Sequence, residues 1–348
     1  MPSLVRQALL MPFWAAQVLT QEKFFARNPI IGNRWLNEHG LHTWRTSVAH
    51  RLAAARRRRL ARLVDARDLA AFERDGFIVR RNFLPSDVFA ALTAQVRELR
   101  APAREMVEGD TVTRLIAVDR TVLSKVPAAR RLLGDPDYRN LIRYVGASAA
   151  APMIYIQSVL SHAVEGAPDP QLDLHTDTFH PTVKAWLFLT DTPEDAMPFV
   201  YVPGSHRLTP ARVAWEKQMS IAASLEPLEH TKRPGRKLPA VISPEQLSGL
   251  GLPPPQSIAV PANTLVVADT FGFHSRGASA KPTCRVEIWA MGRRNPFLPW
   301  NGLDPWSIPG LGSCKPSFYW RSVDVLEGLG LARQRWRPRP ATSAFDPA

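Results

Sequence analysis

The amino-acid sequence predicts a mainly β fold with flanking helices, in which the core is a double-stranded β-helix, or jelly roll. Composition is the first reason. The 348 residues include 32 prolines and 19 glycines, and so turn-rich a chain suits short strands better than a bundle of helices. The second reason is the pattern after Pro152, where short runs of β-forming residues are bounded by Pro, Gly, Asp or Asn. Strands of this length and spacing are typical of a sandwich or jelly roll.

The elements in front of the core are predicted to be two helices around one short strand. Asp65 can cap a helix over 66–75, and Gly76 ends it. Residues 77–79 then form a strand, and Pro85 opens a second helix that runs to about residue 100. The strands predicted for the core follow at 154–160, 172–176, 183–190, 199–202, 257–260, 264–268 and 284–291.

The sequence divides into four segments. Residues 1–64 are expected to form a basic, amphipathic helical segment, and residues 65–294 the jelly-roll domain. Within that domain, residues 208–256 interrupt the run of strands and should form a lid-like insertion near the mouth of the cavity. Residues 295–348 form a Pro- and Trp-rich C-terminal extension.

Cysteine content and hydropathy exclude several classes of protein. Cys284 and Cys314 are the only cysteines, which excludes a disulfide framework and a cysteine-based zinc site. No apolar stretch is long enough and free enough of charge to span a bilayer as a helix. We therefore expect a cytoplasmic protein.

The formal net charge of +13 is concentrated at one end, because residues 1–62 carry eleven basic and only two acidic side chains. Two interpretations of this segment stay open: a helical pair packed on the main domain with its arginines in solvent, or a peripheral helix on the anionic inner face of a membrane. Nucleic acid is not an expected partner, since no recognised nucleic-acid module accompanies the arginines. The apolar residues at helical spacing are Leu41, Trp44, Val48, Leu52 and Ala55.

One short segment carries residues suited to metal chemistry. In a strand, residues two apart point to the same side, so His175 and Asp177 should project together as one nitrogen and one oxygen ligand. His274, just after the predicted strand 264–268, is the best third ligand. Two histidines and one carboxylate form a facial triad that leaves positions open on iron(II). Arg285 follows eleven residues later and offers a bidentate fork for a dicarboxylate co-substrate.

With these residues in this order, the sequence resembles the phytanoyl-CoA dioxygenase family of iron(II)/2-oxoglutarate enzymes. The resemblance runs from about Phe72 to Met291, roughly two thirds of the chain, and includes the turn Pro203-Gly204-Ser205-His206. It implies a cupin-like jelly roll that hydroxylates a substrate with Fe(II), 2-oxoglutarate and O2. The site residues that it implies are His175, Asp177 and His274 as iron ligands, Arg285 at the far carboxylate of 2-oxoglutarate, and Gln157 near the co-substrate.

The sequence also departs from the family pattern. The stretch before the 203–206 turn lacks the family's glycine, and Arg276 stands where a small or hydroxyl residue is common. By strand alternation, Glu287 should point inward beside Arg285 and could form an ion pair with it. His206 is expected to be a structural turn residue, and Lys184 and Trp186 are expected to pack on the barrel face, where they could also contact the co-substrate.

The substrate is expected to be a small molecule that is lipid-like or carries an acyl or phosphate group. Basic residues of the insertion could hold an anionic head group together with Arg276, although a solvated loop is an equal alternative. The insertion residues concerned are Trp215, Lys217, Lys232, Arg233, Arg236 and Lys237. Two other functions stay open: a membrane-surface binding protein on a jelly roll whose iron site has lapsed, and a nucleic-acid-associated oxygenase.

Overall fold

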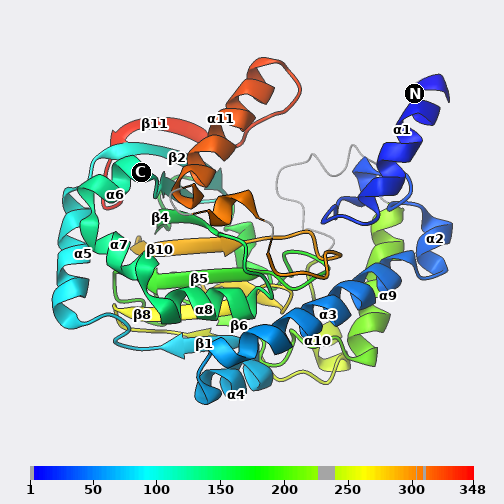
Figure 1. Cartoon of the computed structure of the whole chain (residues 1–348), viewed down its shortest axis with the longest axis horizontal. Coiled ribbons are helices and arrows are strands. Elements are labelled where there is room, and N and C mark those ends of the chain that lie inside the picture. Colours follow the sequence, from blue (N-terminus) through cyan, green and yellow to red (C-terminus); the bar gives the residue numbers. More distant parts are fainter. Residues whose placement is uncertain (1–3, 226–239, 303, 309–310) are drawn as a thin grey trace.

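The computed structural model describes residues 4–225, 240–302, 304–308 and 311–348, and Figure 1 shows a large β-sheet flanked by helices. The sheet has eight strands, and each neighbouring pair is antiparallel. In spatial order its strands are β1 (Phe77–Arg80), β8 (Thr264–Asp269), β5 (Val183–Phe188), β10 (Cys284–Gly292), β4 (Met153–Leu160), β3 (Thr111–Ala117), β2 (Ala101–Glu108) and β11 (Arg337–Thr342). A smaller sheet has the order β7 (Gln256–Ile258), β6 (Phe199–Tyr201) and β9 (His274–Arg276).

The two faces of the large sheet are covered differently, because side chains alternate along each strand. On β5, Ala185 and Leu187 pack into the cluster formed with the helices, whereas Trp186 and Phe188 pack into a second cluster with Phe199 of the small sheet. The second cluster joins both sheets, and it makes the core a two-sheet sandwich. The predicted jelly-roll class with flanking helices is confirmed.

The helices lie outside this sandwich. Figure 1 shows α5 to α8 beside the large sheet, and α3 and α9 together at the other end of the molecule. Their bounds are α1 Leu4–Gln17, α2 Arg34–Glu38, α3 Leu41–Leu60, α4 Ala66–Asp75, α5 Ser86–Glu98, α6 Arg120–Lys125, α7 Pro127–Gly134, α8 Pro136–Val145, α9 Pro210–Ser224, α10 Pro244–Gly249 and α11 Lys315–Gly328. Among the described residues, no helix is both long and apolar enough to cross a membrane.

The predicted entry to the domain agrees with the structure. Helix α4 has the predicted bounds, and Asp65 caps it by accepting a hydrogen bond from the Arg67 backbone N–H. Gly76 ends it at a φ of +87°, a conformation that glycine adopts without strain. A Cβ there would lie 2.4 Å from the His206 ring, so the close approach of the 203–206 turn also requires glycine.

One predicted strand is wrong, and four strands were not predicted. Residues 172–176 form no strand. A short 3₁₀ turn at Pro170–Leu172 leads instead to isolated bridges from His175 to Val241 and to His274. The unpredicted strands are β2, β3, β9 and β11. Strand β11 contains two prolines and lies at an edge of the sheet, where missing N–H donors are tolerated.

The predicted apolar stripe of the N-terminal segment does not form the buried face of α3. That face contains Arg45, Ala49, Ala53 and Arg56, whereas Trp44 is 46% exposed. Arg45 donates hydrogen bonds to three carbonyls of residues 18–22, so it satisfies backbone groups inside the protein. The expectation that the arginines all face solvent or lipid is therefore wrong for these two.

The insertion is packed where the structure describes it. Helix α9 contacts α2 and α3, and Trp215 is buried edge-on against Phe273. Lys217 is exposed on the same helix. Lys232, Arg233, Arg236 and Lys237, which were predicted to hold an anionic head group, lie outside the described residues.

Candidate metal centre

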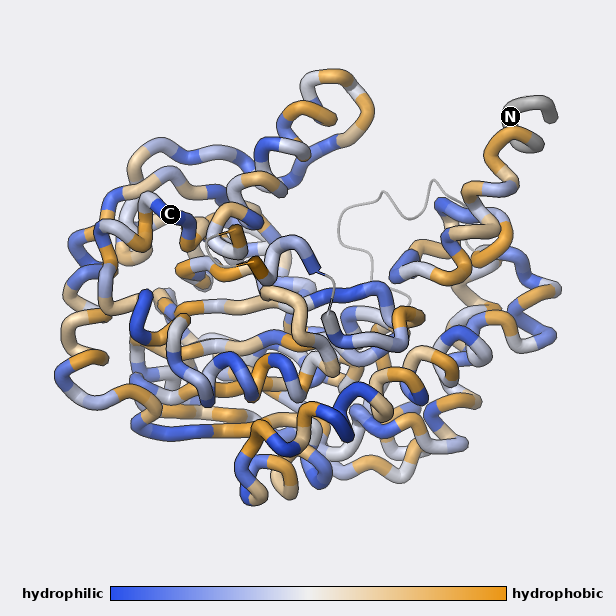
Figure 2. Tube along the Cα trace, viewed as in Figure 1, coloured by the Kyte–Doolittle hydropathy of each residue, from blue (hydrophilic) through white to orange (hydrophobic). Residues whose placement is uncertain are grey.

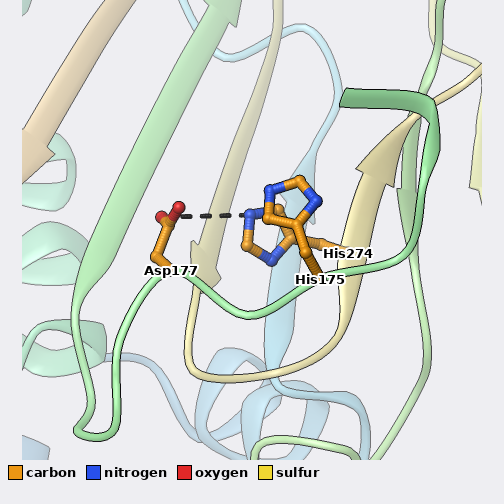
Figure 3. Close-up of side chains that lie close together, drawn as sticks. All are labelled: His175, Asp177 and His274. Atoms are coloured by element: carbon orange, nitrogen blue, oxygen red, sulfur yellow. Dashed lines mark ion pairs between the residues drawn. The ribbon is translucent and has the colours of Figure 1, made fainter. Parts of the chain in front are cut away.

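Three predicted ligands meet at one end of the sandwich (Figure 3). His274 begins β9, and its backbone exchanges two hydrogen bonds of 2.9 Å with His175 in the loop before β5. Asp177 is tied to the same region, because its N–H donates to the Thr270 carbonyl at 3.0 Å. One ligand atom of each side chain lies within 4.8 Å of the others, and the His274 Nε2 to Asp177 Oδ2 distance is 3.9 Å.

Hydrogen bonds fix the orientation of both rings. His175 Nδ1 donates to the Asp173 carbonyl at 2.8 Å, and His274 Nδ1 donates to the Gly272 carbonyl at 2.9 Å. Each ring therefore keeps the lone pair of Nε2 for a further partner. Asp177 Oδ2 is paired with Lys184 Nζ at 2.8 Å, whereas His274 Nε2 is buried and has no hydrogen-bond partner among the described residues. Buried polar atoms are rarely left so, and this donor set fits a divalent metal such as iron(II).

Charge at the three residues also suits metal binding. Burial lowers the pKa of His274 to about 3 with a contribution from His175, and burial lowers the pKa of His175 as well. Both imidazoles are therefore neutral at physiological pH, as a ligand must be. Burial alone would raise the pKa of Asp177, but Lys184, His274 and Arg293 together hold it well below its usual value. The set thus offers two neutral nitrogens and one carboxylate.

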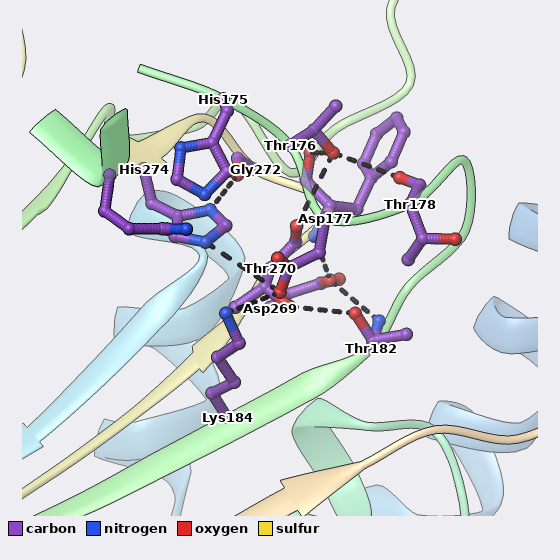
Figure 4. Close-up of polar contacts among 12 residues, drawn as sticks. His175, Thr176, Asp177, Thr178, Thr182, Lys184, Asp269, Thr270, Gly272 and His274 are labelled. Carbon is purple, nitrogen blue, oxygen red and sulfur yellow. Dashed lines mark hydrogen bonds and ion pairs between the residues drawn. The ribbon is translucent and has the colours of Figure 1, made fainter. Parts of the chain in front are cut away.

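Cations from separate parts of the chain surround Asp177. Lys184 on β5 places Nζ 2.8 Å from Asp177 Oδ2 (Figure 4). Lys23 reaches in from the N-terminal segment and donates to the Asp177 carbonyl. Burial, with a contribution from Arg293, lowers the pKa of Lys23 to about 8. Sequence reasoning assigned Lys184 to packing and missed Lys23 altogether, because no local pattern marks a contact across 154 residues.

The predicted co-substrate residues lie on the face of the large sheet that faces the small one. Arg285 and Glu287 share a side of β10, and Gln157 of β4 stands directly opposite Glu287. Arg285 is already paired: Nε lies 2.8 Å from Glu287 Oε2 and Nη2 lies 3.2 Å from Glu287 Oε1. Its third nitrogen, Nη1, donates to the Met197 carbonyl. The ion pair that strand alternation allowed is therefore present.

Two further predicted residues have structural partners. Arg276 is half-buried and pairs with Asp169, so it is not available to an anionic head group as predicted. His206 lies in the 203–206 turn and packs against the Phe72 ring at 5.1 Å between centroids. Burial lowers the pKa of His206 to about 3, with a contribution from Arg57. His206 therefore has a structural role in the turn and is not one of the three candidate metal ligands.

Comparison with protein families gives one match. Residues 72–233 match the family model described as Phytanoyl-CoA dioxygenase (PhyH). The matched segment includes His175 and Asp177 and ends before His274 and Arg285. In the structure, His274 is hydrogen-bonded to His175 of that segment, and Arg285 pairs with Val159 of it.

Among curated proteins, the chain is 30% identical over 166 residues to an ectoine dioxygenase of Bordetella bronchiseptica. The alignment covers 43% of this chain and 52% of that protein, so the chain spans about half the length of its relative. An ectoine dioxygenase of Bordetella parapertussis is also 30% identical, over 167 residues, with the same shares covered.

Among solved structures, two examples are similar at low sequence identity. The non-heme alpha-ketoglutarate-dependent epimerase SnoN from nogalamycin biosynthesis is 19% identical, with a TM-score of 0.39, over 70% of this chain and 93% of that one. HygX from Streptomyces hygroscopicus, solved with nickel and 2-oxoglutarate, is 16% identical, with a TM-score of 0.36, over 66% of this chain and 86% of that one.

Proposed function

We propose that the protein is an iron(II)- and 2-oxoglutarate-dependent dioxygenase that hydroxylates a small molecule, since residues 72–233 match the phytanoyl-CoA dioxygenase family model. One observation carries the proposal. One ligand atom each of His175, Asp177 and His274 lies within 4.8 Å of the others, and the buried Nε2 of His274 has no hydrogen-bond partner among the described residues. The alternative of a lapsed iron site would need a missing ligand or a blocked Arg285. All three ligand side chains are in place, and Arg285 is paired with Glu287, so only the second condition has support.

The roles follow from the geometry. His175, Asp177 and His274 would hold iron(II), and Arg285 with Gln157 would receive the co-substrate. When bound, iron with 2-oxoglutarate and O2 supplies the oxidising chemistry that hydroxylates carbon. The protein's own task is to orient the ligands and to exclude water. The Phe199 ring would help to exclude water. Its centroid lies 5.9 Å from that of the His274 ring and 4.5 Å from that of the Trp186 ring.

The proposed substrate class is a small molecule with a carboxylate or phosphate group. Lys23, Lys184 and Arg293 contribute three positive charges near the single carboxylate of Asp177. Lys23 is half-buried and makes no ion pair with a carboxylate among the described residues, and an ammonium in this setting favours an anionic ligand. A nucleic-acid substrate is not favoured, because Arg45 and Arg56 of the arginine-rich helix are used inside the protein.

Binding and turnover test this function together. Under anaerobic conditions, the wild type should bind iron(II) and then 2-oxoglutarate, and oxygen should start succinate release. A panel of small carboxylates and phosphate monoesters should then raise succinate release above the substrate-free rate. Lys23→Met should raise KM for the best anionic substrate about tenfold or more, since it removes a half-buried charge. The exposed Lys125→Met is the matched control. If the wild type bound neither iron(II) nor 2-oxoglutarate, the proposal would be contradicted.

The segments predicted from the sequence remain our proposal for the organisation of the chain, with residues 65–294 as the catalytic domain. The N-terminal segment adds Lys23 to the site and should be needed for activity. A peripheral membrane role is proposed for α1 alone. It extends away from the body of the protein (Figure 1), and much of it is hydrophobic (Figure 2). Leu9 and Phe13 on it are 76% and 58% exposed.

The membrane proposal predicts salt-sensitive binding to anionic vesicles. The joint substitution of Leu9→Ser and Phe13→Ser should reduce co-sedimentation with phosphatidylserine vesicles several-fold, because it removes apolar groups that would enter the bilayer interface. Val107→Ser is the control, since Val107 is an apolar residue that is 53% exposed on β2. Equal partitioning of the wild type with neutral and anionic vesicles, or with and without the double substitution, would reject this role.

A further inference from the structure

We propose that Glu287 occupies the site where Arg285 would anchor the far carboxylate of the co-substrate, so that 2-oxoglutarate binds only when Glu287 takes up a proton and gives up its place. This inference rests on the proposed function and concerns the regulation of the same site. It assigns to Glu287 a role in setting the affinity for the co-substrate.

The first argument is occupancy of the guanidinium. Glu287 takes both Nε and Nη2 of Arg285, at 2.8 and 3.2 Å, which is the bidentate edge that a dicarboxylate would use. Nη1 on the remaining side donates to the Met197 carbonyl. A second carboxylate therefore cannot form the two parallel hydrogen bonds with Arg285 while Glu287 holds them.

The second argument is the balance of charge around Glu287, which is fully buried. The charged groups that face it are Arg285 on its own strand and Arg276 on β9. Arg276 is already paired with Asp169, and Glu108 of β2 also lies close enough to act on Arg276. Both cations are thus matched before any ligand arrives. Another buried carboxylate would be left without a counter-charge, which costs several kcal/mol.

A proton on Glu287 removes this conflict. Burial raises the pKa of Glu287, with Arg285 and Arg276 acting in the opposite direction, so the carboxyl is already biased towards its neutral form. The proton comes from solvent, and the neutral acid can turn towards Gln157, which stands opposite it on β4. Arg285 then offers its fork to the incoming carboxylate. The linkage requires 2-oxoglutarate to bind more tightly as the pH falls.

The decisive measurement uses the full-length wild type loaded with manganese(II), free of oxygen. Calorimetric titration with 2-oxoglutarate in buffers of different ionisation enthalpy should give an uptake of close to one proton per ligand bound. The Kd should fall by up to tenfold for each unit of pH lowered between 8 and 6. Zero uptake together with a flat pH profile would overturn the inference, and this result needs no variant.

Variants then assign the proton. Glu287→Gln should abolish the uptake and lower the Kd at pH 8 about tenfold or more, whereas the exposed Glu194→Gln should change neither. Lys23→Met should leave the uptake in place, which excludes Lys23 as its source. If Glu287→Gln keeps the uptake and the Kd while Lys184→Met loses 2-oxoglutarate, the far carboxylate lies on the Lys184 side and the inference fails. If manganese binds but 2-oxoglutarate binds to neither the wild type nor Glu287→Gln, the proposed function itself fails.

Discussion

Asp177→Ala should abolish iron(II) binding at micromolar metal and reduce succinate release to the background rate. The substitution removes the only carboxylate of the three candidate ligands and leaves two neutral imidazoles among the cations Lys184 and Lys23. A divalent cation would then meet net positive charge in place of a ligand. Anaerobic iron titration and an assay of succinate measure the two losses separately.

The fold should survive this change, because Asp177 contributes no volume to the hydrophobic clusters of the described residues. A circular dichroism spectrum matching that of the wild type would show that the loss is local. Asp87→Ala, on the exposed side of α5, is the matched control and should keep both metal binding and turnover. Wild-type turnover by Asp177→Ala would mean that the metal site lies elsewhere.

Glu216→Ala should destabilise the protein by about 3–5 kcal/mol, the usual cost of removing one partner of a buried ion pair. Glu216 on α9 accepts from Arg212 at 3.1 Å and contacts His42 Nε2 at 2.9 Å, and all three are buried. Although burial alone would raise it, the pKa of Glu216 is lowered by Arg212 and His42, so the carboxylate is charged. Without it, the Arg212 cation loses its ion-pair partner among the aromatic rings that surround it.

Thermal unfolding gives the size of this effect. With an unfolding entropy of about 2 cal/mol/K per residue, the loss corresponds to a decrease in Tm of roughly 4–7 °C. Lys217→Ala, the next residue along α9, is exposed and should shift Tm by less than about 1 °C. An unchanged Tm for Glu216→Ala would show that the pair is not buried as described.

Local patterns were sufficient for much of the fold. The signals that define helix α4 are local: Asp65 caps its start and Gly76 ends it, so its bounds could be predicted from the sequence. The strands β4, β5, β8 and β10 are runs of β-forming residues between turn signals. The predicted meeting of His175 and Asp177 was correct, although the assumed strand is absent. The bridge from His175 to His274 and the bond from Asp177 to Thr270 bring them together instead.

Contacts between distant segments could not be read from the sequence. The buried face of α3 depends on the segments that pack against it. Arg45 and Arg56 are buried because they donate hydrogen bonds to backbone carbonyls of other segments. Hydropathy alone assigns arginine to the surface, and so it predicted the wrong stripe. Lys23 is the same case within the site, since its acceptor is a backbone carbonyl that carries no sequence signal.

The paired backbones of His175 and His274 have a consequence for the order in which the protein assembles. They join positions nearly a hundred residues apart, and contacts at such separations form only after much of the chain has been ordered. The nascent polypeptide therefore lacks the three assembled candidate ligands. On the proposed function, metal would bind after folding, and each bound ion would then stabilise the folded chain by mass action, as a ligand that the unfolded chain cannot bind in the same way.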